Sequence, residues 1–369
     1  MKEYNSIFLE NNEVDILIKL GALITDLPYS KGIKLVEFDK SIKFYDFDHY
    51  ITIWYEDQHV IGITFSRLEE RFNELSEVLG SFSNLRILIF FETVLHPFPS
   101  SFNKLRDLEH LEFFYYEEDS GSPDQVFHFP KLEFTEEFKE FKKLKKIKIE
   151  GYFNVYFPPS FTSIPNLEDL YLAYCTCTSN RSTYLKNCEI DPNVLESWET
   201  VSCSDLPEDL GKLSSLQKLY LEEVYIKKIP TSIANIPLLK EFELHYSYSC
   251  SSSKMLKNVD PVYRIKSLEK LVFYRCRLES ISKTISSLTN LKELYLYLNR
   301  IKTVPPELKN CQEIEKIDLS RNPLEEELTF LKEFKNLQYI RISQSRSHLI
   351  PKELYEKKNL KIEVLKTFL

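Results

Sequence analysis

Residues 291–313 read LKELYLYLNRIKTVPPELKNCQE, and residues 314–336 read IEKIDLSRNPLEEELTFLKEFKN, so a 23-residue pattern is followed directly by a second copy. Each copy begins with an aliphatic anchor, Leu291 or Ile314, and has further apolar residues three and five positions later. Self-similarity at a period of about 20 to 50 residues is typical of solenoids, in which stacked units bury a shared core. The period therefore predicts the architecture before any single helix or strand is considered.

The same anchor recurs along most of the chain. The anchors are Leu85, Leu108, Leu144, Leu167, Leu216, Leu239, Leu268, Leu291, Ile314, Leu337 and Leu360. Seven of the ten steps between them are 23 residues, and the other three are longer. Residues three and five places after each of the first ten anchors are all apolar, although the whole chain is only 43% apolar. Because alternate residues of a strand face the same side, each unit is expected to contribute a short strand with one buried face.

A proline-containing segment follows the strand in many units. The segments are FPSSF at 98–102, FPPSF at 157–161, LPEDL at 206–210, IPTSI at 229–233, VPPEL at 304–308 and IPKEL at 350–354. Proline fixes φ and suits a turn or the first residue of a helix. We expect the apolar residue that ends each segment to pack inward from the side opposite the strand.

A pattern of L-x-x-L-x-L followed by I-P-x-x-I, at this period, resembles the leucine-rich repeat family in its short intracellular form, over residues 60–369. The resemblance implies an α/β solenoid with a curved parallel sheet on its concave face and turns and short helices on its convex face. Such arrays are usually binding scaffolds, and the short intracellular ones include adaptors that bind small GTPases. The family prefers asparagine eight residues past the anchor, but here only Asn299 and Asn322 match. We therefore expect an incomplete hydrogen-bond ladder outside the C-terminal third, with less regular curvature.

The N-terminal residues 1–59 do not match the repeat. Helix-like spacing relates Val14, Leu17, Ile18 and Leu20. The run YITIWYEDQHVIGITF at 50–65 is typical of a β-hairpin. We interpret 1–59 as a cap with a helix and a hairpin, since repeat arrays need their first core face covered; an independent functional domain is the alternative. Residues 60–369 are assigned to about eleven repeats and a partial last one.

Three insertions lengthen the array, near 117–130, 176–205 and 248–260. All follow the predicted strand of their unit, so we expect them along one rim, where they either flank a binding face or are tolerated loops. The last unit, 359–369, stops within a repeat and would leave an open strand edge, which is an association hazard. Charges that would protect this edge are Lys357, Lys358, Lys361 and Lys366. We expect a monomer rather than a homo-oligomer, with end-to-end dimerisation as the alternative.

Composition excludes several functional classes. A net charge of −8 and a pI near 5.6 argue against nucleic-acid binding. The N-terminus lacks a signal-like apolar run, and no stretch approaches the ~20 apolar residues of a spanning helix, so no membrane partner is expected. Seven glycines and the lack of GxGxxG, GxxxxGK[ST] and HExxH motifs remove the simplest enzyme interpretations. We nominate no catalytic residue and no cofactor.

The cysteines indicate a reducing, cytoplasmic setting, because there are seven and they show no pattern near either end. Thiols in the second and third insertions are Cys177, Cys188, Cys203 and Cys250. Four thiolates can hold zinc, but no CxxC spacing is present, so metal-free thiols are expected and zinc is left to elemental analysis. Cys175, Cys276 and Cys311 occupy core positions and are expected to be buried and inert.

Strand residues between the inward positions are expected to line the concave face. Of the thirty positions four, six and seven past the first ten anchors, ten are aromatic, whereas the 14% average predicts about four. Three of the ten are Phe91, Phe114 and Tyr115. The predicted partner-binding residues are Tyr171, Tyr174, Tyr220, His245, Tyr246, Tyr274, Arg275, Tyr295, Tyr297, Arg321 and Arg341.

Charge is also graded along this predicted face. Glu222, Glu223 and Glu243 make its middle acidic, while the later repeats carry arginines. Tyrosine and arginine are over-represented at binding hot spots. The sequence therefore predicts a non-catalytic protein–protein interaction scaffold. A regulator that binds a small GTPase and a carbohydrate-binding module are the alternatives.

Overall fold

The computed structural model divides into two compact units. It describes residues 2–4, 7–24, 33–37, 51–67, 78–93, 100–116, 131–152, 154–175, 177–178, 206–224, 226, 228–246 and 258–366. The first unit comprises Met1–Leu167 with Tyr174–Glu196, and the second comprises Glu168–Ala173 with Ser197–Leu369. The assignment of residues 1–59 as a cap stays a prediction.

The first unit combines an N-terminal helix and hairpin with parallel repeat strands. Its main elements are β1 (Lys2–Tyr4), β2 (Ile7–Leu9), α1 (Asn11–Ile24), β3 (Ile33–Glu37), β4 (Ile51–Glu56), β5 (His59–Ser66), β6 (Ile87–Phe91), η1 (Ser100–Lys104), β7 (His110–Phe114), η2 (Glu136–Glu140), β9 (Lys146–Glu150) and η3 (Pro159–Ser163), where η denotes a 3-10 helix. Strands β5, β6, β7 and β9 pair in parallel in that order, and β4 joins β5 as an antiparallel hairpin. A separate parallel sheet contains β8 (Lys131–Glu133), β10 (Asn154–Tyr156) and β12 (Cys177–Thr178).

Helix α1 confirms the helix that the spacing of its apolar residues predicted. Val14, Leu17 and Leu20 are buried, because their spacing places them on one side of the helix. Ile18 belongs to the same helix, as its spacing predicted, but its side chain is 55% exposed. No helix in the described part of the chain is both long enough and apolar enough to cross a membrane.

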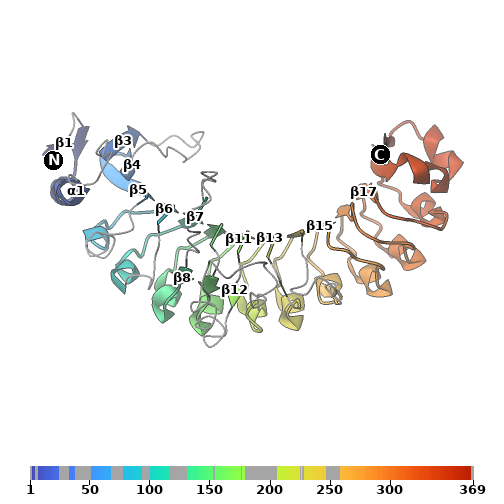
Figure 1. Cartoon of the computed structure of the whole chain (residues 1–369), viewed down its shortest axis with the longest axis horizontal. Coiled ribbons are helices and arrows are strands. Elements are labelled where there is room, and N and C mark those ends of the chain that lie inside the picture. Colours follow the sequence, from blue (N-terminus) through green and yellow to red (C-terminus); the bar gives the residue numbers. More distant parts are fainter. Residues whose placement is uncertain are drawn as a thin grey trace, which may run out of the picture. The chain divides into compact units, whose positions relative to one another are not determined.

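The second unit is a regular alternation of strand and 3-10 helix. Its elements are β11 (Asp169–Ala173), η6 (Leu210–Lys212), β13 (Lys218–Glu222), η7 (Thr231–Asn235), β14 (Glu241–His245), η8 (Val262–Arg264), β15 (Lys270–Tyr274), η9 (Lys283–Ser287), β16 (Glu293–Tyr295), η10 (Pro306–Asn310), β17 (Lys316–Asp318), η11 (Thr329–Glu333), β18 (Tyr339–Ser343), η12 (Gln344–Leu349), η13 (Lys352–Glu356) and β19 (Lys361–Leu365). Each strand pairs in parallel with the next. The strands lie on the inner side of this unit's curve and the 3-10 helices on its outer side (Figure 1).

The core lies between the strands and the 3-10 helices, as predicted. All twenty residues three and five past the first ten anchors are at most 1% exposed. The residues that end the proline segments, from Phe102 to Leu354, are at most 2% exposed. Burial of each such side chain contributes about 1.5–3 kcal/mol, which a single short unit cannot obtain without its neighbours.

Asparagine eight residues past the anchor, at the positions called here the turn column, stabilises the later repeats. Asn299 Oδ1 accepts hydrogen bonds from the backbone amides of Cys276 (2.9 Å) and Leu278 (3.2 Å), and its Nδ2 donates to the Phe273 carbonyl (2.7 Å). Asn322 makes the corresponding bond to the amide of Ile301 (3.1 Å). The predicted ladder in the C-terminal third is therefore confirmed.

The same column in the first unit uses other chemistry. Tyr152 is fully buried, and its hydroxyl donates to the Thr93 carbonyl at 2.6 Å. A phenol reaches one backbone group, whereas the asparagine amide reaches several.

A left-handed bend follows the strand in most repeats. Residues seven past the anchor have φ between 47° and 57°: Glu92, Tyr174, Glu223, Tyr246, Arg275, Leu298 and Arg321. At Gly151 φ is 81°, and a Cβ atom there would lie 1.8 Å from the Tyr115 carbonyl oxygen, so only glycine fits. These side chains lie at the carboxyl end of the strands rather than within them, which corrects the expectation for Tyr174, Tyr246, Arg275 and Arg321.

The insertions fall mostly outside the described residues. Residues 117–130, 179–205 and 248–257 are not described, so the predicted rim is not tested. In the described part of the sheet, β19 is the last strand and pairs with β18. Its register pairs Ile340 with Ile362, 22 residues later, whereas Ile317 pairs with Ile340, 23 residues later. This shorter step places Glu363 beside Arg341.

Candidate functional site: the inner face of the second unit

A continuous row of aromatic rings crosses the inner face of the second unit. Tyr171 stacks on Tyr220 with ring centroids 4.4 Å apart, and Tyr220 lies 4.8 Å from the ring of His245. The row continues from His245 to Tyr274 at 5.7 Å and from Tyr274 to Tyr297 at 4.2 Å. The parallel register pairs Tyr171 with Tyr220 and His245 with Tyr274, and between Tyr220 and His245 the row shifts by two residues along the strand.

The hydroxyl groups of these tyrosines are held by neighbours on the same face. Tyr220 donates to Glu222 at 2.8 Å, and the hydroxyls of Tyr246 and Tyr274 lie 2.7 Å apart. Burial, followed by the bond to Glu222, raises the pKa of Tyr220. Burial and the bond with Tyr246 raise the pKa of Tyr274 to about 12. The raised pKa values keep the phenols of Tyr220 and Tyr274 neutral at physiological pH.

Most of the predicted binding residues meet on this face. Tyr246 packs against Tyr274 at 4.6 Å, and the guanidinium of Arg275 lies 5.3 Å over the Tyr246 ring. Both rings of this pair are half-buried, with part of their surface open to solvent. Arg321 is exposed at the bend after β17. Tyr174 is 48% exposed and belongs with the first unit, so the structure does not assign it to this row.

A hollow of about 600 Å³ adjoins the aromatic row. Its lining residues are Glu243, His245, Lys270, Val272, Tyr295, Tyr297, Lys316, Asp318, Gln338, Tyr339, Arg341 and Lys361. Arg341 donates to Glu363 at 2.8 Å and lies 3.7 Å from the buried carboxylate of Asp318. Burial raises the pKa of Asp318, although bonds from Ser320 oppose it. The predicted residues His245, Tyr295, Tyr297 and Arg341 are thus brought together around one depression.

The sequence interpretation missed the charged residues two past the anchor. Along β13 to β17 this position alternates in sign: Lys218, Glu241, Lys270, Glu293 and Lys316. The alternation forms ion pairs between strands, with Lys218–Glu241 at 2.8 Å and Lys316–Glu293 at 2.7 Å. Opposite charges at equivalent positions of successive units were the signal that should have revealed this stripe.

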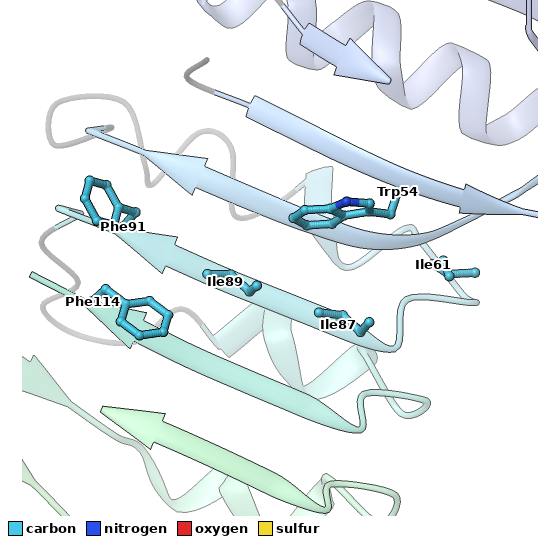
Figure 2. Close-up of a cluster of buried hydrophobic side chains, with 6 residues drawn as sticks. All are labelled: Trp54, Ile61, Ile87, Ile89, Phe91 and Phe114. Atoms are coloured by element: carbon cyan, nitrogen blue, oxygen red, sulfur yellow. The ribbon is translucent and has the colours of Figure 1, made fainter. Parts of the chain in front are cut away.

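The corresponding face of the first unit is different. Phe91 and Phe114 are 5% and 2% exposed, and they form a buried cluster with Trp54, Ile61, Ile87 and Ile89, against which Val36 packs. Figure 2 shows the side chains of the cluster, without Val36, gathered along β4 to β7. The expectation that Phe91 and Phe114 line an open binding face was therefore wrong, because strands from the N-terminal region share their cluster.

The cysteine and acidic side chains are the residues that could react as thiols or hold a metal ion. Cys175, Cys276 and Cys311 are buried free thiols, as predicted, and burial raises the pKa of Cys311 to about 12. Within the described residues, no group of three or more His, Cys, Asp or Glu side chains is arranged to hold a metal ion. Cys188, Cys203 and Cys250 lie outside those residues, and nothing is described of the Cys177 side chain.

A family model agrees with the repeat geometry, the buried positions and the asparagine ladder. Residues 289–333 match the model of leucine-rich repeats in two copies. The chain therefore contains leucine-rich repeats at residues 289–333. Parallel strands on one side and 3-10 helices on the other make its fold an α/β repeat solenoid, as expected.

Known proteins resemble a longer part of this chain. The volume-regulated anion channel subunit LRRC8E of Xenopus tropicalis is 25% identical over 264 residues, which cover 64% of this chain and 30% of the relative. The match to the Xenopus laevis protein of the same name has the same identity and coverage. The chain thus spans less than a third of the length of these relatives.

Solved structures also resemble this chain, at low sequence identity. The Arabidopsis receptor kinase HAESA, solved with the peptide hormone IDA and the co-receptor SERK1, has a TM-score of 0.53 and 16% identity; the match covers 98% of this chain and 54% of that one. A leucine-rich repeat protein of Leptospira interrogans has a TM-score of 0.44 and 19% identity, and the match covers 79% and 76% of the two chains. At these identities the likeness concerns the fold alone.

Proposed function

We propose that this leucine-rich repeat protein is a non-catalytic scaffold that binds a protein partner on the inner face of its second unit. The observation that carries the proposal is the row from Tyr171 to Tyr297, whose rings are half-buried and lie against one another across the strands. Ordered tyrosine rings offer broad contact area and lose little conformational entropy on binding. Neighbouring rings and hydrogen bonds already restrain these side chains, which lowers the entropic cost of association further.

The related structures are compatible with this proposal. Leucine-rich repeat arrays typically act as binding surfaces, and the HAESA structure was solved with a peptide and a protein partner. A small GTPase is one candidate partner, and it rests only on the resemblance to short intracellular arrays. The expected cytoplasmic location and monomeric state belong to the same proposal.

A carbohydrate-binding module is the second candidate. Sugar rings stack on open aromatic faces, but here Tyr171 stacks on Tyr220 at an interplanar angle of 4°, and Tyr274 stacks on Tyr297 at 16°. Neighbouring rings therefore already use part of these faces, which favours a protein partner.

The test is affinity capture from cell lysate with wild-type protein and the double variant Tyr274→Ala, Tyr297→Ala, combined with a glycan array. We expect the double variant to lose captured partners at least about tenfold, as truncation at a hot spot does. Tyr355→Ala is the matched control, because Tyr355 is a 50% exposed tyrosine of η13 on the outer side.

Circular dichroism should show that both variants stay folded. Retained capture by the double variant would refute the inner-face site. Binding to glycans with no specific protein captured would favour the second candidate.

A further inference from the structure

The inner face of the second unit is acidic at its N-terminal end. Strands β11, β13 and β14, together with the bends that follow β13 and β14, carry five carboxylates but one lysine. The carboxylates are Asp169, Glu222, Glu223, Glu241 and Glu243, and the lysine is Lys218. The stacked pair of Tyr171 and Tyr220 lies among them, with both hydroxyls directed at Glu222.

The same face is basic at its C-terminal end. Across β15 to β19 and their bends, the cations are Lys270, Arg275, Lys316, Arg321, Arg341 and Lys361. The carboxylates in this half are Glu293, Asp318 and Glu363, so six cations stand against three anions. Four of the cations, including Arg341 and Lys361, line the hollow.

Ion pairs on the face do not remove this asymmetry. Lys218–Glu241 lies within the acidic half, and Lys316–Glu293 and Arg341–Glu363 lie within the basic half, so each cancels one charge of each sign in its own half. The pair Lys270–Glu243 at 2.6 Å joins the halves and lowers each excess by one. The N-terminal half of the face therefore keeps an excess of negative charge and the C-terminal half an excess of positive charge. A concave surface concentrates the electric field of such charges.

We infer that the partner of this face presents a bipolar segment, with acidic residues over β15 to β19 and basic residues over β11, β13 and β14. This inference rests on the proposed function and names the chemistry of its partner. Tyrosine faces beside carboxylates favour a cationic side chain, and arginine beside tyrosine hydroxyls favours a carboxylate. Complementary potentials of this kind select partners and orient them.

The spacing of the two charge centres sets the length of the segment. From β13 to β17 there are four strand-to-strand steps of about 4.8 Å, or roughly 19 Å. An extended chain advances about 3.3 Å per residue, so the charge centres of a bound segment lie about six residues apart. A peptide with four glutamates, two neutral residues and four lysines in that order, called here the block peptide, has its charge centres at this spacing.

The experiment measures the binding of such fluorescent peptides to the full chain by anisotropy. The probes are the block peptide in both sequence orders, an alternating peptide of the same composition, and all-glutamate and all-lysine peptides. We expect one block peptide to bind at least about tenfold more tightly than the alternating peptide at low salt. The preference should weaken when the ionic strength reaches about 0.1 M, where the screening length is near 10 Å.

Charge reversal locates the effect on the molecule. Glu223→Arg, and Arg321→Glu combined with Lys361→Glu, should each weaken the block peptide about tenfold. Both bend positions tolerate these residues, since Arg275 and Glu92 adopt the same positive φ. The matched controls, Glu333→Arg and Lys309→Glu with Lys335→Glu, carry the same charge changes at exposed residues of η11, η10 and the segment after η11, and should leave binding within about twofold.

Three results would overturn the inference: equal affinity for the alternating and block peptides, equal affinity for the all-glutamate and block peptides, or identical effects of the inner-face and control variants. If the tyrosine double variant abolishes capture of a partner from lysate while the charge reversals do not, the proposed function stands and the bipolar segment is refuted.

Discussion

The two units use the same repeat positions for opposite purposes. Six residues past the anchor, the first unit has Phe91 and Phe114, which are buried, and the second has Tyr274 and Tyr297, which are partly open to solvent. Eight residues past the anchor, the Tyr152 hydroxyl donates to the Thr93 carbonyl, whereas the Asn299 side chain bonds several backbone groups. A repeat position therefore specifies where a side chain lies, while its neighbours decide whether it is buried or stays open to solvent.

The largest expected effect separates the two inner faces. Phe114→Ala should lower the free energy of unfolding by about 3–5 kcal/mol, because it opens a cavity beside Ile89 and Phe91 in the buried cluster. Tyr297→Ala at the equivalent position should cost only about 1 kcal/mol, since that ring is already half-exposed. Urea unfolding followed by circular dichroism measures both, and equal costs would contradict the comparison.

An intermediate effect separates the two turn columns. Asn299→Ala should cost about 2–4 kcal/mol, because it leaves the buried amides of Cys276 and Leu278 without their acceptor. Tyr152→Phe removes a single hydrogen bond and should cost about 1 kcal/mol. The same unfolding assay applies, and a cost for Asn299→Ala no larger than that of the tyrosine variant would show that the ladder is not a major source of stability.

The smallest effect is the pH dependence of stability. The inner face of the second unit carries titratable groups, whereas the cluster around Phe114 is apolar. Burial alone would raise the pKa of Glu243, but hydrogen bonds from His245 and Lys270 outweigh it and lower the pKa below 4.5. Stability from Glu243 is therefore present above its ordinary pKa and is lost as the pH falls through the lowered value. Burial raises the pKa of Asp318, so its contribution has the opposite sign.

Unfolding midpoints between about pH 6 and pH 3 test these signs. Glu243→Gln should lose less stability on acidification than the wild type, and Asp318→Asn should lose more, each by less than about 1 kcal/mol. Parallel curves for the wild type and both variants would show that neither carboxylate is coupled to folding.

Several features followed directly from the order of residues. The period located the strands, the twenty inward side chains and the apolar residues that close each proline segment, because a stacked unit must repeat its buried positions at a constant spacing. The buried state of Cys276 and Cys311 and the hydrogen bonds of Asn299 followed for the same reason. The buried positions recur at the same places in every repeat, so the sequence of one repeat specifies nearly all of them.

Tertiary structure alone decided which outward side chains remain open. Phe114 and Tyr297 have the same offset, and only the packing of Trp54 and Ile61 from another part of the chain distinguishes them. The bend that moves Arg321 out of its strand and the shortened step that brings Glu363 to Arg341 were likewise absent from the period. Such features depend on contacts between distant residues, and a repeat pattern specifies each unit only relative to its neighbours.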